Sequence, residues 1–139
     1  MAIIVSINYW AVLVCSIVSI VLGSLWYGPL FGKPWIKIMG FKKSSMDAAK
    51  KKGMAASYFT AFVSSFVMNY ILAHFVDYTE SATWLMGMQT GFWIWLGFLA
   101  TTMIGIMLWE GRLFKLYAIN AGHYLVALVI NGGILAIWA

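Results

Sequence analysis

Residues 7–27 read INYWAVLVCSIVSIVLGSLWY and contain no charged side chain. Three more apolar runs without an internal charge follow, at about 54–76, 83–109 and 116–138. Each reaches the roughly 20 residues that a helix needs to cross a hydrocarbon core of about 30 Å. Helices satisfy their own backbone in lipid, whereas a barrel would show short alternating segments. The sequence therefore predicts an all-α polytopic membrane protein, in which residues 1–139 form a single domain, a bundle of four transmembrane helices.

The composition excludes several classes of soluble protein. Hydrophobic residues make up 63% of the chain and charged residues 9%, against roughly 45–50% and 25% in soluble domains. So few charges cannot cover the surface of a soluble globule, which argues against a cytosolic enzyme or a disordered tail. The net charge of +5 does not indicate nucleic-acid binding, because seven of the nine basic residues lie between Lys33 and Lys52. The single cysteine, Cys15, permits neither an intrachain disulfide nor a CxxC metal site.

The loops predict an orientation. The segment after the first apolar run is rich in lysine, the short segment 77–80 carries no basic residue, and Arg112 and Lys115 follow the third run. The positive-inside rule then places both basic loops in the cytoplasm and both termini outside, as in a bacterial inner-membrane protein. We expect the lysines to contact anionic lipid head groups; they are Lys33, Lys37, Lys42, Lys43, Lys50, Lys51 and Lys52.

Local signals predict the helix boundaries. Pro29 and Pro34 end the first helix. Residues 35–39 are too few for a stable independent helix. The sequence Ser-Ser-Met-Asp at 44–47 resembles a helix N-cap with an acid in the first turn, so the second helix is expected to begin near Met46. The expected helices therefore span about 7–27, 46–76, 83–109 and 116–138, with a basic cytoplasmic loop at 28–45.

Small residues recur every four positions in three of the apolar runs. Residues four apart share a helix face, and small side chains let helix backbones approach closely in lipid. We interpret these stripes as packing surfaces, within the bundle or in a homo-oligomer; the alternative is a pathway lined by small polar groups. The stripes comprise Ala11, Cys15, Ser19 and Gly23; then Gly53, Ser57, Ala61, Ser65, Asn69 and Ala73; then Gly87, Gly91, Gly97, Thr101 and Gly105.

Polar residues of the fourth run form a candidate ligand cluster. Asn120, His123, Tyr124 and Asn131 lie within about 100° of one helix face. Glu110 ends the third run on the same side of the membrane. Such residues can bind a head group, a ligand or a proton, or only form interhelical hydrogen bonds worth about 0.6 kcal/mol each. Ser57, Ser65 and Asn69 would join Asn120, His123 and Asn131 if the helices line a pathway.

The second histidine, His74, is expected near the opposite membrane surface. Its separation from His123 along the membrane normal is on the order of 20 Å at 1.5 Å per residue, so the two cannot share one haem iron. We expect His74 to form a hydrogen bond with Asp77 or Tyr78. The sequence thus predicts no cofactor and no metal site.

Two motifs carry a resemblance to a known family. Residues 22–35, LGSLWYGPLFGKPW, and residues 119–125, INAGHYL, followed by GILAIW at 133–138, are similar to the uncharacterised bacterial membrane family named domain of unknown function 1761. The resemblance spans nearly the whole chain. It implies a small four-helix membrane protein and implies no activity.

Three hypotheses for function remain open. The first is a non-enzymatic, oligomerising bundle that acts as a structural, lipid-interacting or accessory component, with the bilayer and a further membrane protein as partners. The second is a small channel or facilitator for a polar solute, and the third is a lipid- or cofactor-binding module. An enzyme is disfavoured because the sequence shows no acid–base pair, no phosphate loop, no HExxH and no GxSxG motif.

Overall fold

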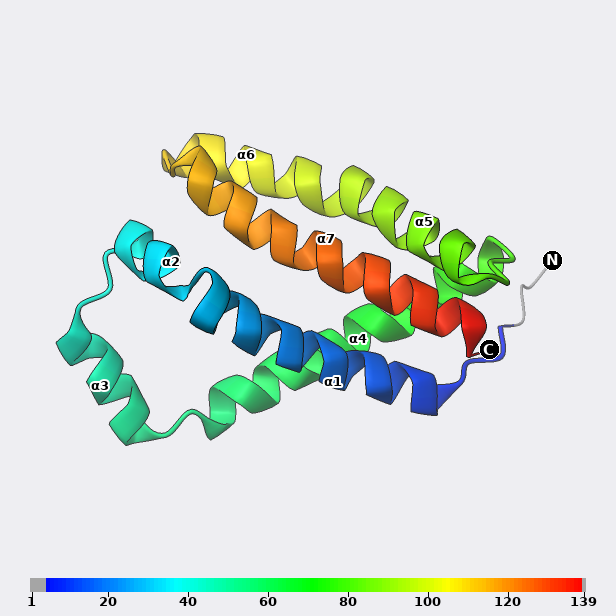
Figure 1. Cartoon of the computed structure of the whole chain (residues 1–139), viewed down its shortest axis with the longest axis horizontal. Helices are drawn as coiled ribbons and strands as arrows, with labels where there is room; N and C mark the ends of the chain where they lie inside the picture. The colour runs from blue at the N-terminus through cyan, green and yellow to red at the C-terminus, as the bar shows by residue number, and fades with distance from the viewer. Residues whose placement is uncertain (1–4, 139) are drawn as a thin grey trace.

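The computed structural model describes residues 5–138, and all regular structure within that range is helical. Four helices are long and apolar enough to cross a membrane, which confirms the predicted all-helical chain with four apolar spans. All four run along the long direction of the molecule, and the second separates from the others toward one end (Figure 1). The spans are Tyr9–Leu30, Ala55–Tyr78, Trp84–Glu110 and Phe114–Ile137.

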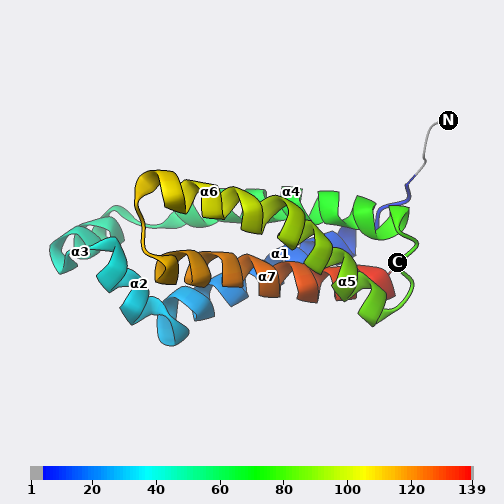
Figure 2. The ribbon, with the colours of Figure 1, turned by 90° about the horizontal axis from the view of Figure 1, so that it is seen from above.

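Two of the spans contain a π-helical stretch, and two short helices lie outside the spans. In chain order the elements are α1 (Tyr9–Leu25), η1 (Trp26–Leu30), α2 (Gly32–Met39), α3 (Lys43–Lys52), α4 (Ala55–Tyr78), α5 (Trp84–Ile94), η2 (Trp95–Ala100), α6 (Thr101–Glu110) and α7 (Phe114–Ile137). The short helices α2 and α3 lie together at one end of the molecule, here called the lysine end (Figure 2).

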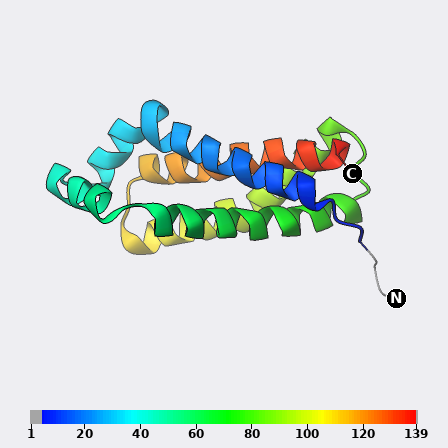
Figure 3. The ribbon, with the colours of Figure 1, turned by 90° about the horizontal axis from the view of Figure 1, so that it is seen from below.

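The first and last described segments meet at the opposite end, here called the termini end (Figure 3). There the Asn8 side-chain amide donates a hydrogen bond to the Trp138 carbonyl at 2.9 Å. The same Asn8 caps α1, because its side-chain oxygen accepts from the backbone N–H groups of Trp10 and Ala11. One residue therefore starts the first span and joins it to the end of the last.

The segment predicted as a loop at 28–45 contains a helix that sequence reasoning missed. The prediction considered only the length of this segment, but aromatic contacts stabilise α2. The Trp35 ring lies 5.1 Å from the Tyr27 ring and 5.3 Å from the Phe41 ring. Pro34 does not break it, since it occupies the first turn, where no intrahelical N–H bond is lost. Gly40 ends it with φ of 72°, in the left-handed region.

The predicted helix at 46–76 is two helices. α3 begins at Lys43 without a side-chain cap, so the N-cap predicted at 44–47 is wrong. α3 ends at Lys52 because Gly53 has φ of 83° and ψ of 147°, a conformation open to glycine and strained for other residues. α4 then begins at Ala55. The glycine predicted to start the packing stripe of this helix instead separates it from α3.

α7 is the central helix, and α5 packs on it most closely. A Cβ built on Gly91 would collide with the Leu128 carbonyl, and one built on Gly87 would collide with the Gly132 carbonyl. The backbones therefore touch along this line, here called the glycine seam (Gly87, Gly91 and Gly132). The sequence stripes include Gly87 and Gly91 but miss Gly132, which faces them from α7.

The other stripes divide between core and surface. Ala11, Cys15 and Ser19 of α1 are buried, as are Asn69 and Ala73 near the end of α4. Ser57 and Ala61 are exposed, because α4 separates from the other spans toward the lysine end (Figure 1). A Cβ on Gly97 or on Gly105 would meet nothing within 4 Å, so these two glycines make no close helix contact inside the chain.

The glycine seam makes a prediction with a matched control on the same span. Gly91→Ala should lower stability by about 1–3 kcal/mol, because the added methyl overpacks against the α7 backbone. Gly97→Ala should leave the stability of the protein unchanged or slightly raised, since alanine favours the helix by about 1 kcal/mol over glycine. Thermal unfolding of both variants in detergent measures the difference. Equal melting temperatures would contradict the seam.

Candidate functional site

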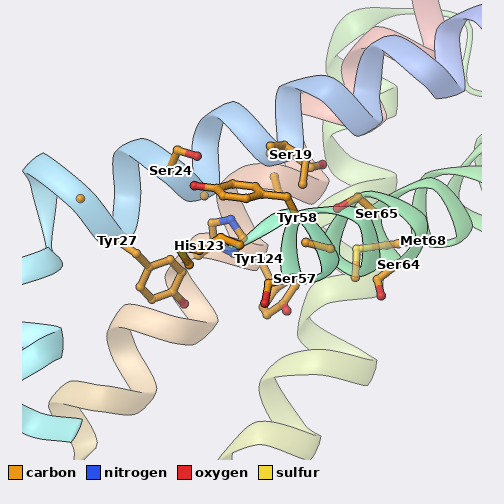
Figure 4. A pocket seen from close by; sticks show the side chains of 16 residues that line it. Ser19, Ser24, Tyr27, Ser57, Tyr58, Ser64, Ser65, Met68, His123 and Tyr124 are labelled. Atoms are coloured by element: carbon orange, nitrogen blue, oxygen red, sulfur yellow. The ribbon is translucent and has the colours of Figure 1, made fainter. Parts of the chain in front are cut away.

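A cleft of about 690 Å³ lies between α1, α4 and α7 on the lysine-end side, where α4 separates from its neighbours. Figure 4 shows polar side chains of all three helices around it. Their hydroxyl, phenol and imidazole groups are set in an otherwise apolar wall that includes Ile20, Met68 and Ala127. The polar lining residues are Ser19, Ser24, Tyr27, Ser57, Tyr58, Ser64, Ser65, His123 and Tyr124.

His123 extends from α7 into the space between α1 and α4 (Figure 4). Its imidazole packs over Gly23, where an added Cβ would lie 3.4 Å from Nε2. The rings of Tyr27 and Tyr124 lie 5.5 and 5.0 Å from it. The imidazole is therefore in van der Waals contact with α1 at position 23.

Both ring nitrogens of His123 are buried and have no hydrogen-bond partner among the described residues. A neutral imidazole carries one N–H donor and one acceptor nitrogen. A buried polar group without a partner costs about 1–3 kcal/mol. A molecule in the cleft that both donates and accepts a hydrogen bond would satisfy the pair.

The predicted cluster around His123 does not assemble as a unit. Asn120 Oδ1 accepts a hydrogen bond from the Tyr27 hydroxyl at 2.7 Å. Asn120 lines a different cavity, of about 180 Å³, together with Glu110 and Arg112. Glu110 is exposed, and its carboxylate lies 3.9 Å from Arg112 Nε. Of the predicted cluster, only His123 and Tyr124 line the large cleft.

Asn131 belongs to a buried group deeper in the molecule, here called the amide layer (Ser19, Asn69 and Asn131). The side-chain amides of Asn131 and Asn69 both donate to Ser19 Oγ, at 2.9 and 3.4 Å. Ser19 in turn donates to the Cys15 carbonyl at 3.0 Å. The two asparagines are 1% and 0% exposed, and their Oδ1 atoms have no partner among the described residues. Ser19, which the sequence analysis assigned to packing, therefore joins three helices.

His74 lies near the termini end of α4, outside the cleft. Its Nδ1 is 2.9 Å from the Tyr70 carbonyl, which can only accept, so the prediction of a hydrogen bond to Asp77 or Tyr78 is wrong. A histidine in a helix can reach the carbonyl one turn earlier. The centroids of the Tyr78 and His74 rings lie 6.1 Å apart.

Within residues 5–138 no group of three or more histidine, cysteine or acidic residues is arranged to hold a metal ion.

Two tryptophans that sequence reasoning did not single out for this role attach neighbouring spans to α7. Trp26 Nε1 donates to the Ile119 carbonyl and Trp95 Nε1 to the Ala121 carbonyl, each at 2.8 Å. Both tryptophans belong to the π-helical stretches η1 and η2. Nothing in the sequence around these tryptophans indicates a hydrogen bond to another helix, because both lie in apolar runs.

All seven lysines predicted to meet head groups are exposed.

Ser19 and Ser24 of α1 provide a matched pair for testing the amide layer. Ser19→Ala removes the acceptor shared by two buried amides, so the free energy of unfolding should fall by about 1–3 kcal/mol. Ser24→Ala removes an exposed hydroxyl on the same helix, and its free energy of unfolding should stay within about 0.5 kcal/mol of the parent value. Denaturation in detergent, followed by circular dichroism, measures both. A Ser19→Ala variant as stable as Ser24→Ala would show that the layer does not stabilise the fold.

The comparisons with known proteins identify a family and nothing closer. No curated protein and no solved structure matches the chain. A family model described as "Protein of unknown function (DUF1761)" matches residues 10–136, which include all four spans except the first residue of α1 and the last of α7. The match confirms the resemblance carried by residues 22–35 and 119–125. The chain therefore belongs to the DUF1761 family of proteins of unknown function.

Proposed function

We propose that the chain is an integral membrane protein that binds an amphiphilic small molecule in the cleft between α1, α4 and α7, without an enzymatic role. The observation that carries this proposal is His123, which lines the cleft and whose two buried ring nitrogens have no partner among the described residues. The cleft volume of about 690 Å³ falls within the roughly 300–1,000 Å³ of small-molecule sites.

The lining favours a ligand with a polar head and an apolar body. Ile20, Met68 and Ala127 offer apolar surface, while the hydroxyls and His123 offer a few directed hydrogen bonds. A head group that carries two hydroxyls can donate to one ring nitrogen and accept from the other through a second oxygen, because the two nitrogens point in different directions. Such a mixed lining is typical of pockets for small organic ligands.

The bilayer itself is the second proposed partner. With both basic loops in the cytoplasm, the lysine end lies at the cytoplasmic face and the cleft in the cytoplasmic leaflet. The seven exposed lysines between Lys33 and Lys52 then lie among anionic head groups, each contributing about 1 kcal/mol of attraction. A further membrane partner and a homo-oligomer remain predictions from the small-residue stripes. Gly105, open inside the chain, is a glycine available to such a contact.

A substitution that fills the cleft tests the binding proposal. Ala61 lines the cleft, whereas Val63 is an exposed α4 residue outside it. Native mass spectrometry of protein released from nanodiscs should show a bound amphiphile for the parent and for Val63→Trp. Ala61→Trp should lose that adduct, because the indole occupies the ligand space.

A second variant examines the head-group contact. His123→Phe keeps an aromatic ring over Gly23 but removes both nitrogens, so the adduct should be weakened while Val63→Trp retains it. Absence of any adduct on the parent protein, or equal retention in Ala61→Trp and Val63→Trp, would refute binding in the cleft.

The proposed orientation has a separate test. On a Cys15→Ala background, single cysteines at Ser45, in α3, and at Ala82, at the termini end, report which side each end faces. In intact bacterial cells whose outer membrane is permeable to it, a charged thiol reagent should modify Ala82→Cys, whereas Ser45→Cys should react only after the inner membrane is opened. The reverse pattern would invert the topology.

A further inference from the structure

A third pocket, of about 390 Å³, lies at the termini end, where residues 6–8 meet the ends of α4 and α7. It is here called the termini pocket. Asn8 lines it from the start of α1, Ala73 and Asp77 from the end of α4, and Leu135 from the end of α7. The large cleft lies on the lysine-end side of those helices. The large cleft and the termini pocket thus lie toward opposite ends of α4 and α7.

The two cavities are aligned along the helices. On α4 and on α7, three residues spaced four apart lie on one helix face. The first lines the cleft, the second belongs to the amide layer, and the third lines the termini pocket. On α4 the cleft reaches Met68, five residues before Ala73, and on α7 it reaches Ala127, eight residues before Leu135. These separations are about 7.5 and 12 Å at 1.5 Å per residue. The two series are Ser65, Asn69 and Ala73 on α4, and Ala127, Asn131 and Leu135 on α7.

The barrier between the cavities contains hydrogen-bond acceptors without donors. Asn69 uses its side-chain N–H groups on Ser19 Oγ and on the Ser65 carbonyl, at 3.4 and 2.8 Å. Because the Ser65 carbonyl can only accept, the Asn69 amide nitrogen must face it, and the Asn69 oxygen is left unpaired. The Asn131 oxygen is unpaired as well. Leu72 and Leu128, near Asn69 and Asn131 in the chain, are fully buried apolar side chains of the same core.

We infer that the cleft and the termini pocket are the two halves of one route for a small neutral solute that donates hydrogen bonds, closed here at the amide layer. A buried donor is what Asn69 Oδ1 and Asn131 Oδ1 lack, and a passing hydroxyl or amide supplies one. The inference goes beyond the proposed amphiphile site, since it depends on the termini pocket and on the layer between the cavities.

The solute is neutral because no charged side chain lies between the two cavities. The sequence has no Asp, Glu, Lys or Arg at 53–76 or at 116–138, and the first span has none either. A charge at the centre of a bilayer is costly without a partner. Polyols and small amides meet both conditions: they carry several donors and no charge.

Solute flux tests the inference directly. Full-length protein in phospholipid vesicles is mixed with a gradient of glycerol or of urea, and light scattering follows the volume change. Vesicles that contain the protein should take up at least one probe severalfold faster than protein-free vesicles. The double variant Asn69→Leu and Asn131→Leu should return the rate to that of protein-free vesicles. Val67→Leu, an exposed position on α4, should keep the parent rate.

Thiol labelling gives a second result that does not depend on the double variant folding. On the Cys15→Ala background, Ser65→Cys and Ala73→Cys should react with a charged, water-soluble thiol reagent from opposite sides of the membrane. Uptake of both probes at the protein-free rate overturns the inference, as does labelling of both cysteines from one side or of neither. If the parent protein carries no amphiphile adduct but shows solute flux, the proposed binding function is refuted and the route stands. If it carries the adduct but shows no flux, the route is refuted and the binding function stands.

Discussion

The backbones of α5 and α7 touch at Gly87, Gly91 and Gly132, and the arrangement of the other helices depends on this contact. In lipid no hydrophobic effect drives helices together, so dispersion between closely fitted backbones becomes the main attraction. The contact holds the third span along one side of α7. The first and second spans then pack on the remaining surface of α7, and α7 becomes the element that every other span contacts.

Polar groups at particular positions along α7 form hydrogen bonds with the other spans. The indoles of Trp26 and Trp95 donate to the carbonyls of Ile119 and Ala121, two residues apart on α7. Further along, Asn131 reaches Ser19 of α1, which Asn69 of α4 also contacts. α4 is held firmly only near this layer and beyond it, because its residues closer to the lysine end are exposed. The cleft results from that one-sided attachment.

The chemistry of the cavities follows from what this packing leaves unsatisfied. Buried polar groups are normally paired, yet His123 at the cleft and the two asparagine oxygens in the layer have no partner among the described residues. The unpaired side chains are therefore confined to the region in and between the two cavities, where a ligand or solute can supply the missing partner.

Composition and the absence of charges from four long runs were sufficient to predict four helical spans, because backbone groups in lipid must be satisfied locally. The spacing of small residues likewise pointed to Gly87 and Gly91. Spacing on one helix carries no information about the facing helix, so the sequence grouped Asn120, His123 and Asn131 on one face although they contact Tyr27, the cleft and Ser19 respectively. It also joined α3 to α4 across Gly53, whose positive φ is not encoded in hydropathy. Only the tertiary structure decided which partners Asn120 and Asn131 find, because those partners, Tyr27 and Ser19, come from another span.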